Sequence, residues 1–296
     1  MIDRAAFRKH RRYAQTAGLG EVGAELHDLR ALDLEAERAQ WSYALGVGAW
    51  LGLAVVALAA AAHAGYPSWA FAVVGGCLLA GASCFVVAER ATHMDVENRR
   101  YDLVERILTL LAIDLGPEAE VSIRLELEDP RGADKRVGDD ADGDWRVERY
   151  EDPWLELRGR LLDETAFVLR IDALPEERSR QETTPQGETL TKRVWEEETR
   201  LVLELQPPLR RYDRLEAVAR VAEAAVRLPE HARLEALSLE PEALRLEVRT
   251  RAAWTAAPPN EPDVSEAPGT ELVAMMFLSL YHMLHLSERV TAGVAG

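Results

Sequence analysis

Two long uncharged runs dominate the pattern of polar and apolar positions. No Asp, Glu, Lys or Arg occurs from Tyr43 to Ala62, or again from Ala64 to Ala88. A helix rises 1.5 Å per residue, so about 20 apolar residues cross a bilayer core of roughly 30 Å. The turn between the two expected spans is formed by residues 63–68, which include a Gly at position 65 and a Pro at position 67. The pattern therefore predicts a two-helix transmembrane hairpin over residues 41–90.

Basic residues flank the hairpin on both sides, but the turn between the two runs contains none. Arginine and lysine are retained on the cytoplasmic side of membranes, so both termini are expected in the cytoplasm. All basic residues but Lys9, Lys135 and Lys192 are arginine, a composition typical of GC-rich bacteria. The expected location is thus the bacterial inner (cytoplasmic) membrane, with a multi-pass topology. A signal peptide is excluded because the first run begins too far into the chain.

Small residues recur at four-residue spacing in both runs, at Gly48 and Gly52 in the first and at Gly76 and Ala80 in the second. Such stripes let helices approach closely in lipid. They pack either against each other within the hairpin, which we favour, or against further copies of the chain. Neither run contains an ionisable residue, which argues against a transporter or pump and favours an anchor.

The polar part of the chain, residues 91–251, reads as a cytosolic α+β domain with a mostly antiparallel sheet. Apolar and polar residues alternate with the period of two that half-buried strands show. Helical periodicity appears at 102–115 and 215–228, and residues 175–188 read as a polar loop. Two small tandem subdomains would also fit. The strands are expected at residues 121–127, 155–161, 167–171, 201–205, 234–239 and 244–248.

The two ends of the chain differ in character. Residues 1–40 form a basic and helical cytoplasmic segment, residues 252–270 a Pro-rich linker, and residues 271–296 an apolar helix. The apolar stretch Leu272–Leu286 is too short to span a membrane comfortably. It docks on the domain core, which we favour, captures a partner helix, or lies at the membrane interface. The residues that would make this contact are Met275, Met276, Phe277, Leu280, Met283 and Leu284.

The net charge and the cysteine content argue against nucleic-acid binding and against cysteine-based sites in the polar part of the chain. The chain has 35 basic and 51 acidic residues and a net charge of -16, which argues against nucleic-acid binding. Its two cysteines, Cys77 and Cys84, both lie in the second apolar run. The polar part therefore contains no disulfide and no cysteine-ligated metal, as expected of a domain in a reducing compartment.

Recognisable catalytic motifs are missing: the sequence has no phosphate-cradling loop, no zinc pattern and no nucleophile elbow. The run Asp140, Asp142, Asp144 resembles a calcium loop in its spacing. However, Gly138 and Arg149 would then occupy the terminal ligand positions, so a solvated acidic loop is the better interpretation. No catalytic residue, metal or cofactor is predicted.

Two hypotheses for function follow from these features. The first is a membrane-anchored, non-enzymatic interaction or scaffold protein that presents its acidic domain in the cytosol. Its partners would be the lipid bilayer and either a second protein or further copies of itself. The alternative is an oligomeric membrane effector or channel gated by a cytosolic sensor domain. A membrane-tethered enzyme would require converging carboxylates in a cleft of the sheet.

Overall fold

The computed structural model describes residues 7, 11–63, 65, 68–92, 98–183, 189–208, 210, 212, 215–240, 242–251 and 268–294. The chain divides into two compact units, a sheet unit (residues 1–25 and 99–296) and a helical unit (residues 26–98). The elements are β1 (Arg12–Gly18), α2 (Leu19–His63), α3 (Ser68–Thr92), α4 (Asn98–Leu115), β2 (Glu120–Glu126), the 3-10 helix η1 (Ala133–Lys135), β3 (Arg136–Asp142), β4 (Trp145–Tyr150), β5 (Asp152–Arg160), β6 (Ala166–Thr183), β7 (Thr189–Gln206), α5 (Leu215–Ala225), β8 (Ala232–Leu239), β9 (Leu244–Thr250) and α6 (Pro268–Val294).

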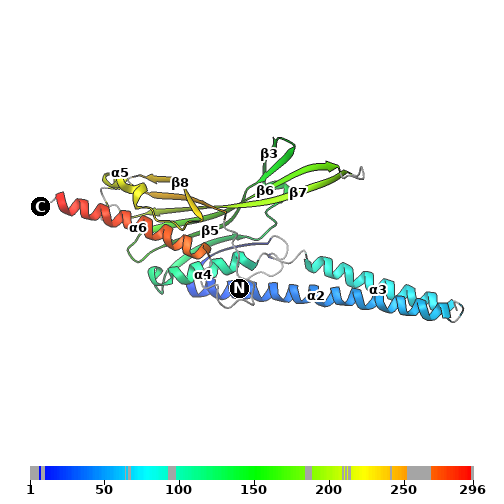
Figure 1. The fold of residues 1–296 in the computed structure, drawn as a ribbon. Helices are drawn as coiled ribbons and strands as arrows, with labels where there is room; N and C mark the ends of the chain where they lie inside the picture. Colours follow the sequence, from blue (N-terminus) through cyan, green and yellow to red (C-terminus); the bar gives the residue numbers. More distant parts are fainter. Residues whose placement is uncertain are drawn as a thin grey trace. The chain divides into compact units, whose positions relative to one another are not determined.

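The strands of the sheet unit form one antiparallel sheet (Figure 1). Within the described residues its order is β1-β2-β5-β6-β7-β9-β8, and the β3–β4 hairpin joins the far half of β6 through β4. Every pairing is antiparallel. The predicted mostly antiparallel sheet accompanied by helices is therefore confirmed.

One face of this sheet is the hydrophobic core. Alternate residues of the central strands are buried completely, because successive side chains of a strand point to opposite faces. Helix α4 contributes an apolar stripe that includes Val104, Ile107 and Leu111. The strand residues of the core include Ile123, Leu125, Leu157, Leu169, Ile171, Leu201, Leu203, Leu246 and Val248.

Helix α5 connects β7 to β8, which run parallel to each other with β9 between them. Parallel strands need a crossover of this kind, whereas antiparallel neighbours can be joined by a tight turn. The helix buries Leu215, Val218 and Ala222, and it packs against α6. The predicted helix at 215–228 and the strands on either side therefore combine into one crossover unit.

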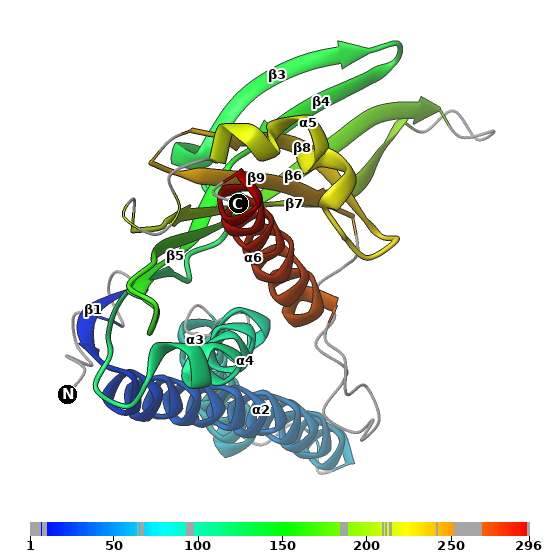
Figure 2. The same cartoon turned by 90° about the vertical axis from the view of Figure 1, so that its left-hand side faces the viewer.

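Helix α6 docks on the sheet unit and is longer than the predicted segment 272–286 (Figure 2). The Phe277 ring meets Phe167 of β6 edge to face, with 5.5 Å between the ring centroids. Ser279 accepts a hydrogen bond from the backbone N–H of Arg227, and Tyr281 donates one to Asp163. Burial and the neighbouring Asp163 carboxylate raise the pKa of Tyr281. Of the predicted linker 252–270, residues 252–267 lie outside the described residues.

The sequence analysis missed three strands and the outer halves of two more. β1 lies inside the segment expected to be helical, and β3 and β4 contain the acidic run. β6 extends through residues 175–183 of the expected polar loop, residues 184–188 are not described, and β7 begins at Thr189, before the strand expected at 201–205. Apart from β1, these stretches are paired strands rich in charge, in which arginine and glutamate meet across neighbouring strands, as Arg149 and Glu176 do at 3.1 Å. Apolar alternation, the signal used for prediction, is weak there.

The helical unit contains the second part of α2 together with α3. One segment, Trp41–His63, is long and apolar enough to cross a membrane by its length and composition, with a mean hydropathy of 2.1. The apolar segment described in α3, Phe71–Val87, is shorter. One candidate span is therefore found, and the two-helix transmembrane hairpin stays a prediction.

Gly159 of β5 is placed where a larger residue has no room. A Cβ atom there would lie 2.7 Å from the Phe167 ring and 3.3 Å from Leu115 Cδ2. The Phe167 ring is itself packed against Phe277 and has little freedom to move. Gly159 therefore allows β5, β6 and α4 to approach closely.

We expect Gly159→Ala to lower the free energy of unfolding by about 1–3 kcal/mol, the usual cost of overpacking a core. Gly138→Ala in β3 is the matched control, because a Cβ atom there meets no atom within 4 Å. The measurement is denaturant unfolding of the full chain in detergent, followed by tryptophan fluorescence. Equal midpoints for the two variants would contradict this packing.

Candidate functional site

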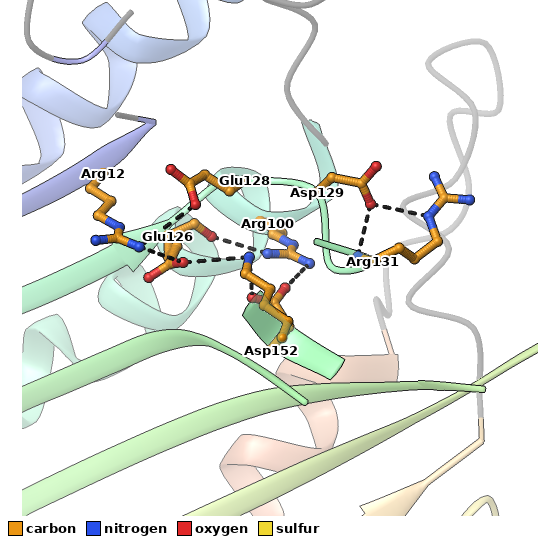
Figure 3. A network of polar contacts seen from close by, with 8 residues as sticks. Arg12, Arg100, Glu126, Glu128, Asp129, Arg131 and Asp152 are labelled. Atoms are coloured by element: carbon orange, nitrogen blue, oxygen red, sulfur yellow. Dashed lines mark hydrogen bonds and ion pairs between the residues drawn. The ribbon is translucent and has the colours of Figure 1, made fainter. Parts of the chain in front are cut away.

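A buried ionic cluster lies where α4, η1, β2 and β5 meet in the sheet unit (Figure 3). Asp152, at the first position of β5, is fully buried. Its Oδ2 atom accepts a hydrogen bond from Arg100 at 2.6 Å, and its Oδ1 atom is 2.8 Å from Lys135 Nζ. The Arg100 and Lys135 side chains are each only 6% exposed.

Glu126 extends the cluster toward the edge of the sheet. Its carbonyl oxygen accepts a hydrogen bond from Arg100, and its carboxylate contacts Lys135 at 3.4 Å and Arg12 at 3.3 Å. Arg12 also approaches Glu128, so three basic groups face three carboxylates. The charges balance and the central groups are buried, so the cluster joins β1, β2, β5 and α4 through ion pairs.

A second polar site, the arginine groove, lies on the sheet face opposite the core. It is a cavity of about 430 Å³. Its charged lining consists of the arginines Arg149, Arg178, Arg200, Arg233, Arg249 and Arg251 and the glutamates Glu151, Glu176, Glu196 and Glu198. More positive than negative side chains therefore line this groove, in a chain whose net charge is -16.

Strand register sets three of these arginines in a row. Arg200 of β7 is directly opposite Arg249 of β9, and Arg249 is directly opposite Arg233 of β8. Opposite residues of an antiparallel pair share a face, and like charges in this position destabilise the sheet. The row is therefore tolerated only with carboxylates close beside it.

Four carboxylates balance the positive charge of this arginine row, two beside Arg233 and Arg249 and two beside Arg200. Glu198 contacts Arg251 at 2.6 Å, Arg233 at 3.5 Å and Arg249 at 3.6 Å. The hydrogen bond from Arg251, with the charges of Arg233 and Arg249, lowers the pKa of Glu198 although partial burial opposes it. The remaining contacts are those of Glu235 with Arg233 and Arg249, and of Asp172 and Glu151 with Arg200.

The pKa of Asp172 is shifted in the opposite direction to that of Glu198. Burial raises its pKa, and the hydrogen bond and charge of Arg200 lower it by less. The Nε atom of Arg249 is buried and makes no hydrogen bond among the described residues, because its ion-pair partner Glu235 lies 3.6 Å away. A guanidinium N–H without a hydrogen bond can donate to an oxygen of a bound anion.

The predicted metal candidates Asp140, Asp142 and Asp144 lie along the β3–β4 hairpin. Asp140 faces Arg149 at 3.6 Å, and Asp142 faces Arg178 at 3.4 Å. The acidic run thus pairs with two arginines of the groove. Among the residues that the structure describes, no group of three or more His, Cys, Asp or Glu is placed to bind a metal ion.

The predicted contact residues of the C-terminal helix take two positions. Met276, Leu280, Met283 and Leu284 are completely buried, and Phe277 is nearly so. Met275 lines a separate cavity of about 640 Å³ between α5 and α6, together with Leu278, Ser279, His282 and Arg227. Leu278 is 68% exposed at this cavity.

The glycines that were predicted to pack helices together are not the glycines that lie against a neighbouring helix in the structure. A Cβ atom at Gly48, Gly52 or Gly76 would meet no atom within 4 Å. At Gly46 it would lie 3.3 Å from Cys84 Sγ, and at Gly81 it would lie 3.5 Å from Trp50 Cβ. Ala80, the fourth predicted residue, is half-buried.

Comparison with known proteins does not assign the chain to a family. No family model matches the chain, and neither a curated protein nor a solved structure matches it. Function is therefore argued from the geometry alone.

The arginine groove was not found by reasoning from the sequence. A signal existed in the strand segments, where charged residues recur at every second position, as in Glu196, Glu198 and Arg200. That alternation places the three side chains on one face of a strand. Which charges meet across strands depends on register, which the sequence pattern did not supply.

We expect Asp152→Ala to destabilise the fold by about 3–5 kcal/mol, because buried Arg100 would lose the Asp152 carboxylate and buried Lys135 would keep only the more distant Glu126. Asp152→Asn, which retains one acceptor oxygen, should cost less. The control is Arg158→Gln: Arg158 pairs with Glu156 at the comparable distance of 2.8 Å but is 54% exposed. Its loss should cost about 0–1 kcal/mol. Equal losses in denaturant unfolding would contradict the structural role of the cluster.

Proposed function

We propose that the chain is a membrane-anchored, non-enzymatic protein that presents the sheet unit in the cytosol to bind a partner. The observation that carries this proposal is the contrast between its two units. The helical unit exposes large apolar side chains such as Trp41, Leu45 and Leu79, and only 11% of its candidate span is buried. Exposed apolar surface on this scale is stable in lipid and costly in water.

The finer topology is part of the proposal. Helix α3 would form the second span, which makes the protein multi-pass in a bacterial inner membrane with both termini cytoplasmic. Supporting this, the residues between the two apolar runs include no lysine or arginine, whereas basic residues lie on both flanks. The contact of Gly46 with Cys84 fits two antiparallel helices that pack together.

The chemistry of the groove favours binding over catalysis. Among the residues that the structure describes, its lining contains no His, Ser, Thr or Cys, the residue types that most often form a nucleophile–base pair. Its tyrosine, Tyr150, has a pKa raised by burial and by Glu148, which keeps the phenol protonated. Six guanidinium groups instead provide fixed hydrogen-bond donors, the usual equipment of an anion-recognition surface.

One observation favours the alternative, an oligomeric effector or channel gated by the sheet unit. Gly48, Gly52 and Gly76 have open space where a Cβ atom would be, so these positions are accessible to a second copy of the chain. A small-residue stripe of this kind suits helix association in lipid.

The test is native mass spectrometry of the full chain, extracted in mild detergent from its own cells. We expect a stoichiometric second polypeptide that stays associated in Gly48→Leu. A Cβ atom at Gly48 meets no atom within 4 Å, so the larger side chain should not disturb the packing of the anchor helices. Gly46→Leu is the comparison variant, because the new side chain would clash with Cys84 and should disturb the packing of α2 on α3.

The other outcomes contradict the proposal in different ways. A homo-oligomer without a second polypeptide, dissociated by Gly48→Leu, would favour the effector. A monomer in every preparation would contradict both functions.

A further inference from the structure

The arginine row on β7, β9 and β8 is an arrangement that folding alone does not favour. Arg200, Arg249 and Arg233 face one another directly across the sheet. Opposite positions elsewhere on this face include unlike pairs, as Glu156 opposite Arg170, and isolated like pairs, as Glu176 opposite Glu196, whereas the arginine row joins three like charges on three strands. A sheet selected only for stability would place a carboxylate in the middle of the row. Residues that oppose folding in this way are typical of binding sites.

We propose that the arginine groove binds a phosphate-bearing small molecule, whose phosphate displaces the Glu198 carboxylate from Arg233, Arg249 and Arg251. This inference rests on the proposed function, in that the sheet unit is the part of the protein that binds. In the structure, Glu198 occupies the position of the ligand anion, since its carboxylate contacts all three guanidinium groups.

A ligand must compete with Glu198 for the three arginines, and this requirement favours a phosphate over a carboxylate. Glu198 is tethered to the groove, so a free carboxylate of equal charge gains little by replacing it. A phosphate carries up to two negative charges and three acceptor oxygens at neutral pH. It can therefore use the Nε donor of Arg249, which is buried and makes no hydrogen bond among the described residues. Arginine also binds phosphate in a bidentate manner, which adds specificity.

The far end of the groove provides a second anchor for the same ligand. Arg149 and Arg178 both contact Glu176, at 3.1 Å and 2.7 Å. Each also has a more distant, exposed partner on the β3–β4 hairpin, Asp140 at 3.6 Å and Asp142 at 3.4 Å. Both arginines are partly exposed, at 49% and 34%. The cavity between the two arginine groups, about 430 Å³, is within the range of small-molecule sites. A ligand with two linked anionic groups fits this arrangement better than an isolated phosphate.

The experiment is isothermal titration calorimetry with inorganic pyrophosphate and the full chain in detergent. We expect binding to the unchanged protein and affinity at least about tenfold lower in Arg249→Gln, because a charge-assisted hydrogen bond is lost. Glu198→Gln should bind several-fold more tightly, since the competing carboxylate is neutralised. Increased affinity on removing a native carboxylate is not expected of a purely structural ion network.

Arg158→Gln is the matched control, the same substitution on the same sheet face but outside the groove. Thermal unfolding of each variant shows whether it is folded. No binding by either the unchanged chain or Glu198→Gln would overturn the inference, as would equal weakening by Arg158→Gln and Arg249→Gln.

A hexaglutamate peptide separates this inference from the proposed function. Binding of the peptide without binding of pyrophosphate would overturn the phosphate assignment but leave a protein-docking sheet unit. Binding of pyrophosphate by a chain that has no protein partner in its own membranes would support the inference and contradict the interaction function.

Discussion

The two-residue alternation of strand side chains determines what each part of the sheet unit does. It sends leucine, isoleucine and valine to one face, under α4, α5 and α6, and sends arginine and glutamate to the other. The apolar face supplies stability through burial. The polar face remains open, and its charges are arranged by strand register. Asp152, Arg100 and Lys135 interrupt this division as the buried centre of an ionic cluster. Arg12, Glu126 and Glu128 complete the cluster and balance its charge.

Sequence pattern predicted the parts of this fold in which alternation is apolar. The strands near 121–127, 155–161, 201–205 and 244–248 and the helices at 102–115 and 215–228 were all found. β3, β4 and the outer halves of β6 and β7 were missed because many of their cross-strand contacts are ionic. β1 was missed because its sequence, RYAQTAG, has a single large apolar residue, Tyr13, and shows no clear alternation. The arginine groove was missed for a related reason: Arg200, Arg249 and Arg233 are far apart in sequence and meet only through register.

Membrane anchoring and anion binding would be complementary functions in one chain. The run from Tyr43 to Ala62 has no charged residue, so this part of the helical unit offers a ligand little beyond apolar contact. In the proposed account the sheet unit supplies the recognition chemistry: Glu198 balances three arginines and would be replaced by a stronger anion. A protein of this kind would bring an anionic ligand or a protein partner to the membrane surface, without chemistry of its own.

The most direct test of this account is cysteine labelling in sealed spheroplasts with a membrane-impermeant maleimide. Cys77 and Cys84 are first replaced by alanine, and single cysteines are then placed at His63, the last residue of α2, and at Glu240, in the β8–β9 turn. The account predicts that His63→Cys is labelled from outside and that Glu240→Cys is labelled only after lysis. Labelling of Glu240→Cys in intact spheroplasts, or release of the chain by alkaline carbonate, would contradict it.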